Sequence, residues 1–211
     1  MMLRLAILSV TASWVFLLAS GGCAKSPTRV QPPIIDASAA GQKAIATYDV
    51  NKDGVLSGPE LDKAPALNAA MAKIDADNDG KLTAHEVANR IKQWQASKLG
   101  LMPVSCTVRL DGKPLADATV TLVPDACLGP NVQKATGKTD ANGQAALSVA
   151  NPPEPSLRGV APGFYRVEIS NASGGTETIP AEYNQQTTFG LEVAADSNIP
   201  DNGITYDLKS K

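Results

Sequence analysis

Apolar residues recur with two different periods along this chain. From about residue 40 to residue 101 they return every three or four positions, and from Val104 onward they alternate with polar residues. The first period is typical of amphipathic helices, and the second is typical of strands with one buried face. We therefore expect a helical half followed by a β half.

Three helices are predicted in the first half, at about residues 40–48, 65–74 and 84–97. Pro65 suits the first turn of the second helix, because proline is tolerated there but not in a helix interior. The apolar faces consist of Ala44, Ile45 and Tyr48; of Leu67, Met71 and Ile74; and of Val87, Ile91 and Trp94. Stripes of this kind indicate a core rather than a ligand groove.

The second half predicts about seven short strands. In the first strand Val104, Cys106, Val108 and Leu110 alternate with polar residues. The expected strands cover about residues 104–110, 118–122, 134–138, 144–149, 164–170, 187–193 and 204–208. Turn sequences such as Asp201-Asn202-Gly203 separate them. Short strands with regular turns and no helix indicate an antiparallel β-sandwich.

Two twelve-residue acidic loops lie in tandem within the helical half. Calcium needs about six to eight oxygen ligands, which alternate short side chains in a tightly curled loop can supply. Gly54 and Gly80 occupy the sixth position, where the turn is sharp. The predicted ligands are Asp49, Asn51, Asp53, Val55, Ser57 and Glu60 in the first loop, and Asp75, Asp77, Asp79, Lys81, Thr83 and Glu86 in the second. Val55 and Lys81 would contribute their carbonyl oxygens.

These two stretches resemble a paired EF-hand, with two calcium sites. Leu56 and Leu82 at the eighth position would be buried where the paired loops form short strands. Serine or threonine at the ninth position and glutamate at the twelfth form a capping box in each loop, so that the exiting helix starts inside the loop. The second loop has four carboxylates and the first has three, which favours the second as the tighter site.

The composition of the helical half favours calcium as a structural ion. Calcium sensors open to expose a methionine-rich groove, whereas buffering pairs barely open. Residues 40–101 contain one methionine, Met71, and the connector between the loops, residues 61–74, is short.

The β half resembles the carboxypeptidase-regulatory-like domain, a transthyretin-like β-sandwich, over about residues 103–211. The resemblance rests on residues 108–124, on Thr139-Asp-Ala-Asn-Gly-Gln144 and on Gly163-Phe-Tyr-Arg-Val167. The ending, with Ile179-Pro-Ala-Glu-Tyr-Asn184 and Leu191-Glu-Val193, is similar to small surface lipoproteins of planctomycete-type bacteria. The resemblance implies a domain with no general enzymatic role.

Composition argues against catalysis and against nucleic-acid binding. The 211 residues carry a formal net charge of −2 and one histidine, His85. Transthyretin-like hydrolases use several histidines, and residues 103–211 contain none. There is no basic stripe of the kind that nucleic-acid partners require. We expect a non-catalytic protein.

Residues 1–23 are typical of a lipoprotein-type signal peptide, with Arg4 followed by an apolar run and small residues. Ser20-Gly21-Gly22-Cys23 looks like a lipobox that would place a lipid anchor on Cys23, although Ser20 stands where leucine is common. Ordinary cleavage near Gly22 or Ala24 is the alternative. Residues 24–39 would then form a flexible tether. These features predict export to the cell envelope and attachment to a bacterial membrane.

Cys106 and Cys127 form the remaining pair of cysteines. An oxidising compartment permits a disulfide between them, and two small buried thiols are the alternative. Asp140-Ala-Asn142-Gly143 echoes a calcium loop, but Asn151 replaces the glutamate at the twelfth position, which favours a β-turn.

The predicted organisation is a signal peptide at residues 1–23, a tether at 24–39, an EF-hand pair at 40–101 and a β-sandwich at 102–211. Calcium would stabilise the helical half, and the sandwich would be a surface binding or spacer module for an unknown protein or polysaccharide partner. Two alternatives are an adhesion module, which exposed aromatics among Tyr165, Tyr183, Phe189 and Tyr206 would favour, and an accessory subunit of an envelope enzyme complex.

Overall fold

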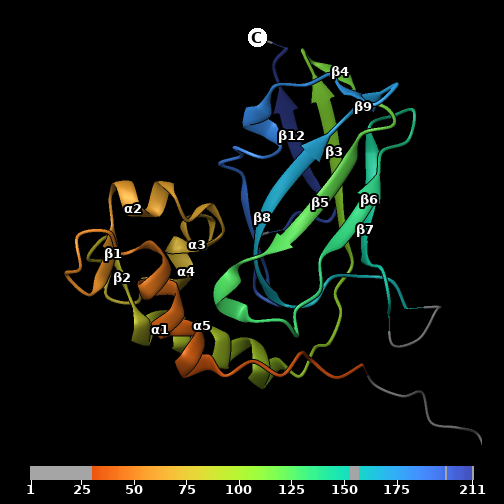
Figure 1. The fold of residues 1–211 in the computed structure, drawn as a ribbon. Helices are drawn as coiled ribbons and strands as arrows, with labels where there is room; N and C mark the ends of the chain where they lie inside the picture. The colour runs from red at the N-terminus through yellow and green to blue at the C-terminus, as the bar shows by residue number, and fades with distance from the viewer. Residues whose placement is uncertain (1–29, 153–156, 198, 211) are drawn as a thin grey trace, which may run out of the picture.

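The computed structural model describes residues 30–152, 157–197 and 199–210. The helical half lies beside one end of a curved sheet, and the C-terminus lies at the other end (Figure 1). Within the described residues, no helix has both the length and the apolar character needed to cross a membrane. The predicted signal peptide and Cys23 lie outside the described residues.

The helical half contains five helices and one pair of short strands. They are α1 (Ala37–Tyr48), β1 (Val55–Ser57), α2 (Pro59–Asp62), α3 (Pro65–Ala69), α4 (Met71–Ile74), β2 (Lys81–Thr83) and α5 (Ala84–Ser97). The bounds of α5 agree with the prediction. Asp36 caps α1, its carboxylate accepting the N–H of Ala39 at 3.0 Å, so this helix starts earlier than predicted.

The helix predicted over residues 65–74 is interrupted at Ala70, which has φ −97° and ψ 1°. No glycine or proline stands at the interruption. The two pieces have different neighbours, because α3 packs on the sheet and α4 packs on α5. Tertiary packing thus overrides the local helical pattern here.

The β half forms one curved sheet in the order β11-β8-β5-β6-β7-β3-β12, with β4 beside β3. Its strands are β3 (Val104–Leu110), β4 (Lys113–Pro114), β5 (Thr119–Pro124), β6 (Ala135–Lys138), β7 (Gln144–Val149), β8 (Gly163–Ser170), β11 (Gly190–Val193) and β12 (Ile204–Leu208). A small hairpin, β9 (Ala172–Ser173) with β10 (Thr176–Glu177), and two 3-10 turns, η1 (Ala126–Leu128) and η2 (Ala181–Tyr183), complete the half.

The expectation of a wholly antiparallel sheet is wrong for one pair of strands. β12 runs parallel to β3, with Ile204 opposite Cys106 and Leu208 opposite Leu110. The last strand returns to the edge beside the first one, and the other pairings in the sheet are antiparallel. Alternation predicts the strands but leaves their direction open.

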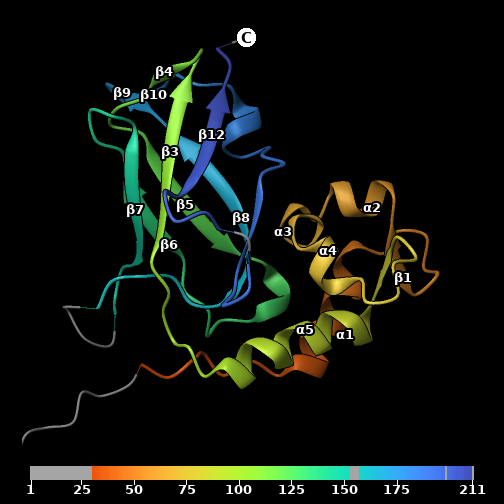
Figure 2. The same cartoon turned by 180° about the vertical axis from the view of Figure 1, so that it is seen from behind.

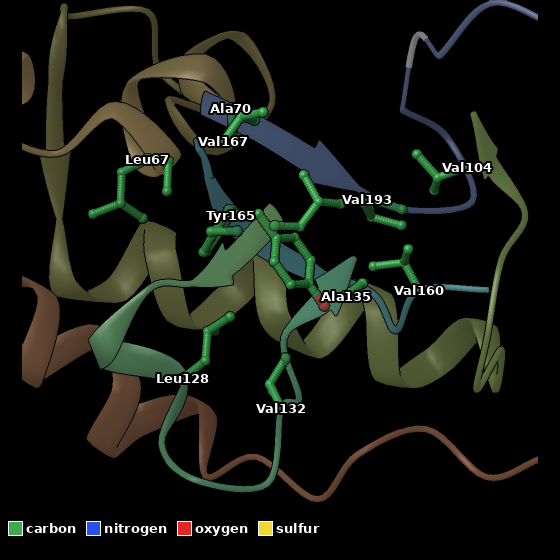
Figure 3. Close-up of a cluster of buried hydrophobic side chains, with 14 of the residues drawn as sticks. Leu67, Ala70, Val104, Leu128, Val132, Ala135, Val160, Tyr165, Val167 and Val193 are labelled. Atoms are coloured by element: carbon green, nitrogen blue, oxygen red, sulfur yellow. The ribbon is translucent and has the colours of Figure 1, made fainter. Parts of the chain in front are cut away.

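The two halves share one hydrophobic core. Leu67 and Ala70, from the connector between the acidic loops, lie in the same cluster as Tyr165, Val167 and Val193 of the sheet (Figure 3). At Gly190 in β11 a Cβ atom would lie 1.8 Å from the carbonyl oxygen of Pro65. Only glycine permits this close approach of α3 to the strand.

The expected tether ends earlier than residue 39. Residues 37–39 form the first turn of α1, and Ile35 is buried. The backbone oxygen of Ile35 accepts a hydrogen bond from Gln95 at 2.7 Å, and that of Ile34 accepts one from Asn131 at 2.8 Å. The segment from residue 30 to 36 therefore bridges the two halves of the molecule.

The two cysteines are free and buried, so of the two alternatives for this pair the structure shows two buried thiols. Cys106 lies in β3 and Cys127 in η1. Burial raises the pKa of the Cys106 thiol to about 11. For Cys127, burial followed by the charge of Asp125 raises the pKa further, so both thiols are unreactive while buried.

Candidate metal centre

The two acidic loops lie side by side at the outer end of the helical half (Figures 1 and 2). β1 and β2 join them as an antiparallel pair with Leu56 opposite Leu82. Both leucines are fully buried, as predicted. Val55 and Lys81 begin the two strands, and Ser57 and Thr83 end them. Packing and strand pairing therefore hold the second halves of both loops.

The second loop brings three carboxylates together. One oxygen each from Asp75, Asp77 and Glu86 lie within 4.8 Å of one another. Gly80, at φ +80°, turns the chain so that its N–H donates to Asp75 Oδ2 at 3.0 Å. Asp79 accepts the N–H of Lys81 at 2.8 Å and is not a member of this group of three.

Asp75 Oδ1 is buried and has no hydrogen-bond partner among the described residues. A buried polar atom without a partner costs about 1–3 kcal/mol, and more when it carries charge. A divalent cation bound among Asp75, Asp77 and Glu86 would supply the missing partner. The donor set contains oxygen alone, which is the set that calcium prefers. The residues of the second loop thus fit the ion.

Glu86 is oriented by the loop that it would close. Its Oε1 accepts the N–H of Ala76 at 3.1 Å, and its Oε2 accepts the N–H of Thr83 at 2.9 Å. The N–H of Glu86 in turn donates to Thr83 Oγ1 at 3.2 Å, which completes the predicted capping box. Both carboxylate oxygens face the loop, as a bidentate ligand requires.

In the first loop, groups of the same loop donate hydrogen bonds to the carboxylates. Asp49 Oδ1 accepts the N–H of Lys52 at 2.5 Å, and Oδ2 accepts that of Gly54 at 2.9 Å. The amide of Asn51 donates to Asp53 Oδ2 at 3.0 Å. Among the described residues, the acids of this loop form no group of three as close as that of the second loop.

The capping box predicted for the first loop is half formed. Glu60 is 7% exposed, and its carboxylate accepts the N–H groups of Val50 at 2.9 Å and of Ser57 at 3.1 Å. The reciprocal bond, in which the serine hydroxyl would accept the N–H of Glu60, is not formed, because α2 begins with Gly58 as its N-cap, at φ +46°, and Pro59 in its first turn. The exiting helix therefore starts one residue later than in the second loop.

Comparison with known families finds one matching segment, residues 67–89. It matches the EF hand. An EF hand is a helix, a calcium loop and a helix, so the match indicates calcium binding. The segment contains the whole second loop, and the first loop lies outside it. No curated protein and no solved structure matches the chain.

Sequence analysis missed an ion-pair cluster behind this EF hand, centred on Arg90, which is 3% exposed. Arg90 Nε lies 2.5 Å from Glu192 Oε1, and the two terminal nitrogens lie 2.9 and 2.7 Å from the oxygens of Asp196. Trp94 Nε1 donates to the same oxygen of Glu192 at 2.9 Å. Burial lowers the pKa of Arg90, but the bonds to Asp196 and Glu192 outweigh it and raise the pKa above its usual value.

One signal in the sequence could have revealed this cluster. Arg90 stands within the apolar stripe of α5, between Val87 and Trp94, where the helix is buried. A charged residue at such a position needs a partner of opposite charge. The partners are about one hundred residues away along the chain, so the sequence does not identify them.

A second polar contact joins the first loop to the sheet. Tyr48, which directly precedes Asp49, donates its hydroxyl to Asp125 Oδ2 at 2.7 Å. Burial, followed by the charge and hydrogen bond of Asp125, raises the pKa of Tyr48. The tyrosine therefore keeps its proton, and the bond persists across physiological pH.

Proposed function

We propose that this chain is an exported, non-catalytic protein in which two calcium ions stabilise an EF-hand pair. The observation that carries the proposal is the group of Asp75, Asp77 and Glu86 around the unpartnered oxygen of Asp75. The pairing of Leu56 with Leu82 supports a second ion in the first loop, because it joins the two loops as one unit. His85 is exposed and lies beside a ligand, which fits a protein without acid–base catalysis.

Calcium is a structural ion in this proposal rather than a signal. A sensor must let its helices swing apart to expose an apolar groove. Here α1 packs on α5 and on η1, and α3 packs on β11 and β8. Opening would break these contacts together with the buried ion pairs of Arg90.

The sheet is proposed to be a transthyretin-like sandwich that acts as a surface binding or spacer module. The curvature of the sheet supports this proposal. β11 and β12 are the two edge strands of the sheet, yet the rings of Phe189, just before β11, and Tyr206, in β12, have centroids 5.3 Å apart. A cleft of about 540 Å³ between these edges and the helical half, lined in part by Lys73, Leu191 and Thr205, is the proposed place for a protein or polysaccharide partner.

Adhesion through exposed aromatic rings has less support. Tyr165 and Tyr206 are buried, and Tyr183 stacks on Phe189 with centroids 5.8 Å apart. Their contacts are with each other and with the core. An accessory role in an envelope enzyme complex remains compatible with the cleft.

Calorimetric titration and thermal unfolding of the purified protein test the calcium proposal. We expect calcium to bind and to raise the melting temperature by about 5–10 °C at one hundred times its dissociation constant, while magnesium fails to replace it. Glu86→Gln should remove most of this shift, and Glu182→Gln, at an exposed site in η2, should leave it unchanged. Absence of binding up to millimolar calcium would contradict the proposal.

Export with a lipid anchor rests on residues 1–23. We expect the protein to incorporate labelled palmitate when it is produced in a bacterium, because lipobox cysteines are acylated. Cys23→Ser should abolish the label and release the protein from the membrane fraction. An unlabelled wild-type protein in the soluble envelope fraction would instead indicate ordinary cleavage.

A further inference from the structure

The helix that ends just before Asp49 and the helix that holds Glu86 are both attached to the β half by polar contacts. α5 begins inside the second loop, with Glu86 in its first turn, and Arg90 follows one turn later. The guanidinium of Arg90 binds Asp196 with two nitrogens and Glu192 with a third. A bidentate arginine pair fixes geometry as well as distance. Through α5, these bonds fix the position of the second half of the loop relative to β11.

The aromatic ring next to Arg90 strengthens this attachment. Trp94 shares Glu192 with Arg90 and packs edge-on against Phe164 of β8, with ring centroids 4.3 Å apart. Glu192 therefore receives two donors from α5 while it is almost fully buried. Loss of the Arg90 bond would leave the buried carboxylate without its partner of opposite charge, which is costly.

The first loop has its own attachment. The bond from Tyr48 to Asp125 ends α1 against η1, one residue before the ligand Asp49. Asp125 is buried and also accepts the N–H of Cys127 at 2.9 Å, so its position is set by the β half. The helix that enters the first loop and the helix that leaves the second are thus both tied to the sheet.

We infer that Glu192 and Asp125, two residues of the sheet half, are positioning residues that set the calcium affinity of the loops. This inference rests on the proposed calcium binding. Without calcium the clustered carboxylates repel each other and push the loop segments apart, and the attachments of α1 and α5 resist that movement. The loops are therefore preorganised, which reduces the cost of binding. By linkage, calcium must stabilise the attachment to the same extent.

Calcium titration of full-chain variants tests the inference. We expect Glu192→Gln and Tyr48→Phe each to weaken calcium binding about five-fold or more, the lower range of typical coupling between sites. Neither residue is a ligand. Asp117→Asn, which removes the exposed pair with Lys138, is the control and should bind calcium like the wild type.

Hydrogen exchange provides a readout that a merely structural role would not change. In the wild type, calcium should slow amide exchange in β11 (Gly190–Val193), a strand that holds no ligand, and the effect should shrink in Glu192→Gln. Equal destabilisation of the apo and calcium-bound forms, with unchanged affinity in both variants, would overturn the inference alone. Absence of calcium binding by the wild type would overturn both this inference and the proposed function. If Glu192→Gln fails to fold, Tyr48→Phe, which keeps the ring, decides the matter.

Discussion

A single oxygen atom distinguishes the two acidic loops at the scale of residues. Asp75 Oδ1 is buried without a partner, whereas the equivalent oxygen of Asp49 accepts the N–H of Lys52 at 2.5 Å. A cation entering the second loop satisfies an unpaired atom, but one entering the first must compete with an existing hydrogen bond. The difference adds to the extra carboxylate of the second loop.

Asp75→Asn should therefore weaken the tighter binding step more than Asp49→Asn does. We expect a loss of about ten-fold or more for Asp75→Asn, the order of change that ligand charge produces in such loops. Calorimetry resolves the two steps when their affinities differ. Because both substitutions keep the size of the side chain, each serves as the control for the other. Equal losses, or a larger loss for Asp49→Asn, would mean that the hydrogen bond from Lys52 does not compete with calcium.

Elements whose signals are local were predicted well. The helix Ala84–Ser97 and the strands Val104–Leu110, Gln144–Val149 and Ile204–Leu208 have the expected bounds. Each has a strong period and a nearby cap or turn, such as the capping box at the start of α5. The acidic positions of the loops also have a local signal, since their spacing is fixed within twelve residues, and their role as ligands stays a prediction.

Features that depend on contacts between distant segments were missed. The break at Ala70 coincides with packing of α3 on β11, and the parallel pairing of β12 with β3 joins residues about one hundred positions apart. The cluster of Arg90 with Glu192 has the same origin. Periodicity indicates which face of an element is buried, but it does not identify the element that packs against this face.

At the scale of the whole molecule, the helical half and the sheet share a common core. Leu67 and Ala70 belong to the same cluster as Tyr165 and Val193 (Figure 3). The two buried thiols lie in different parts of this core, so their reactivity measures the opening of each part. Cys127 lies in η1, which α1 covers, and Cys106 lies in β3, beside the edge strand β12. If the halves opened separately, the thiol at their junction would become reactive first.

We expect both thiols to react at one common rate, because the attacking species is the thiolate and burial suppresses it at both sites. Reaction then requires opening of the shared core. Labelling of Cys23→Ser protein at pH 8, followed by mass spectrometry of the two peptides, measures each rate. Calcium should slow both by the same factor, since it binds the folded molecule and shifts the opening equilibrium as a whole. Labelling of Cys127 well before Cys106 would show that the helical half detaches on its own, and the affinity set by Glu192 would then be lost in that detached form.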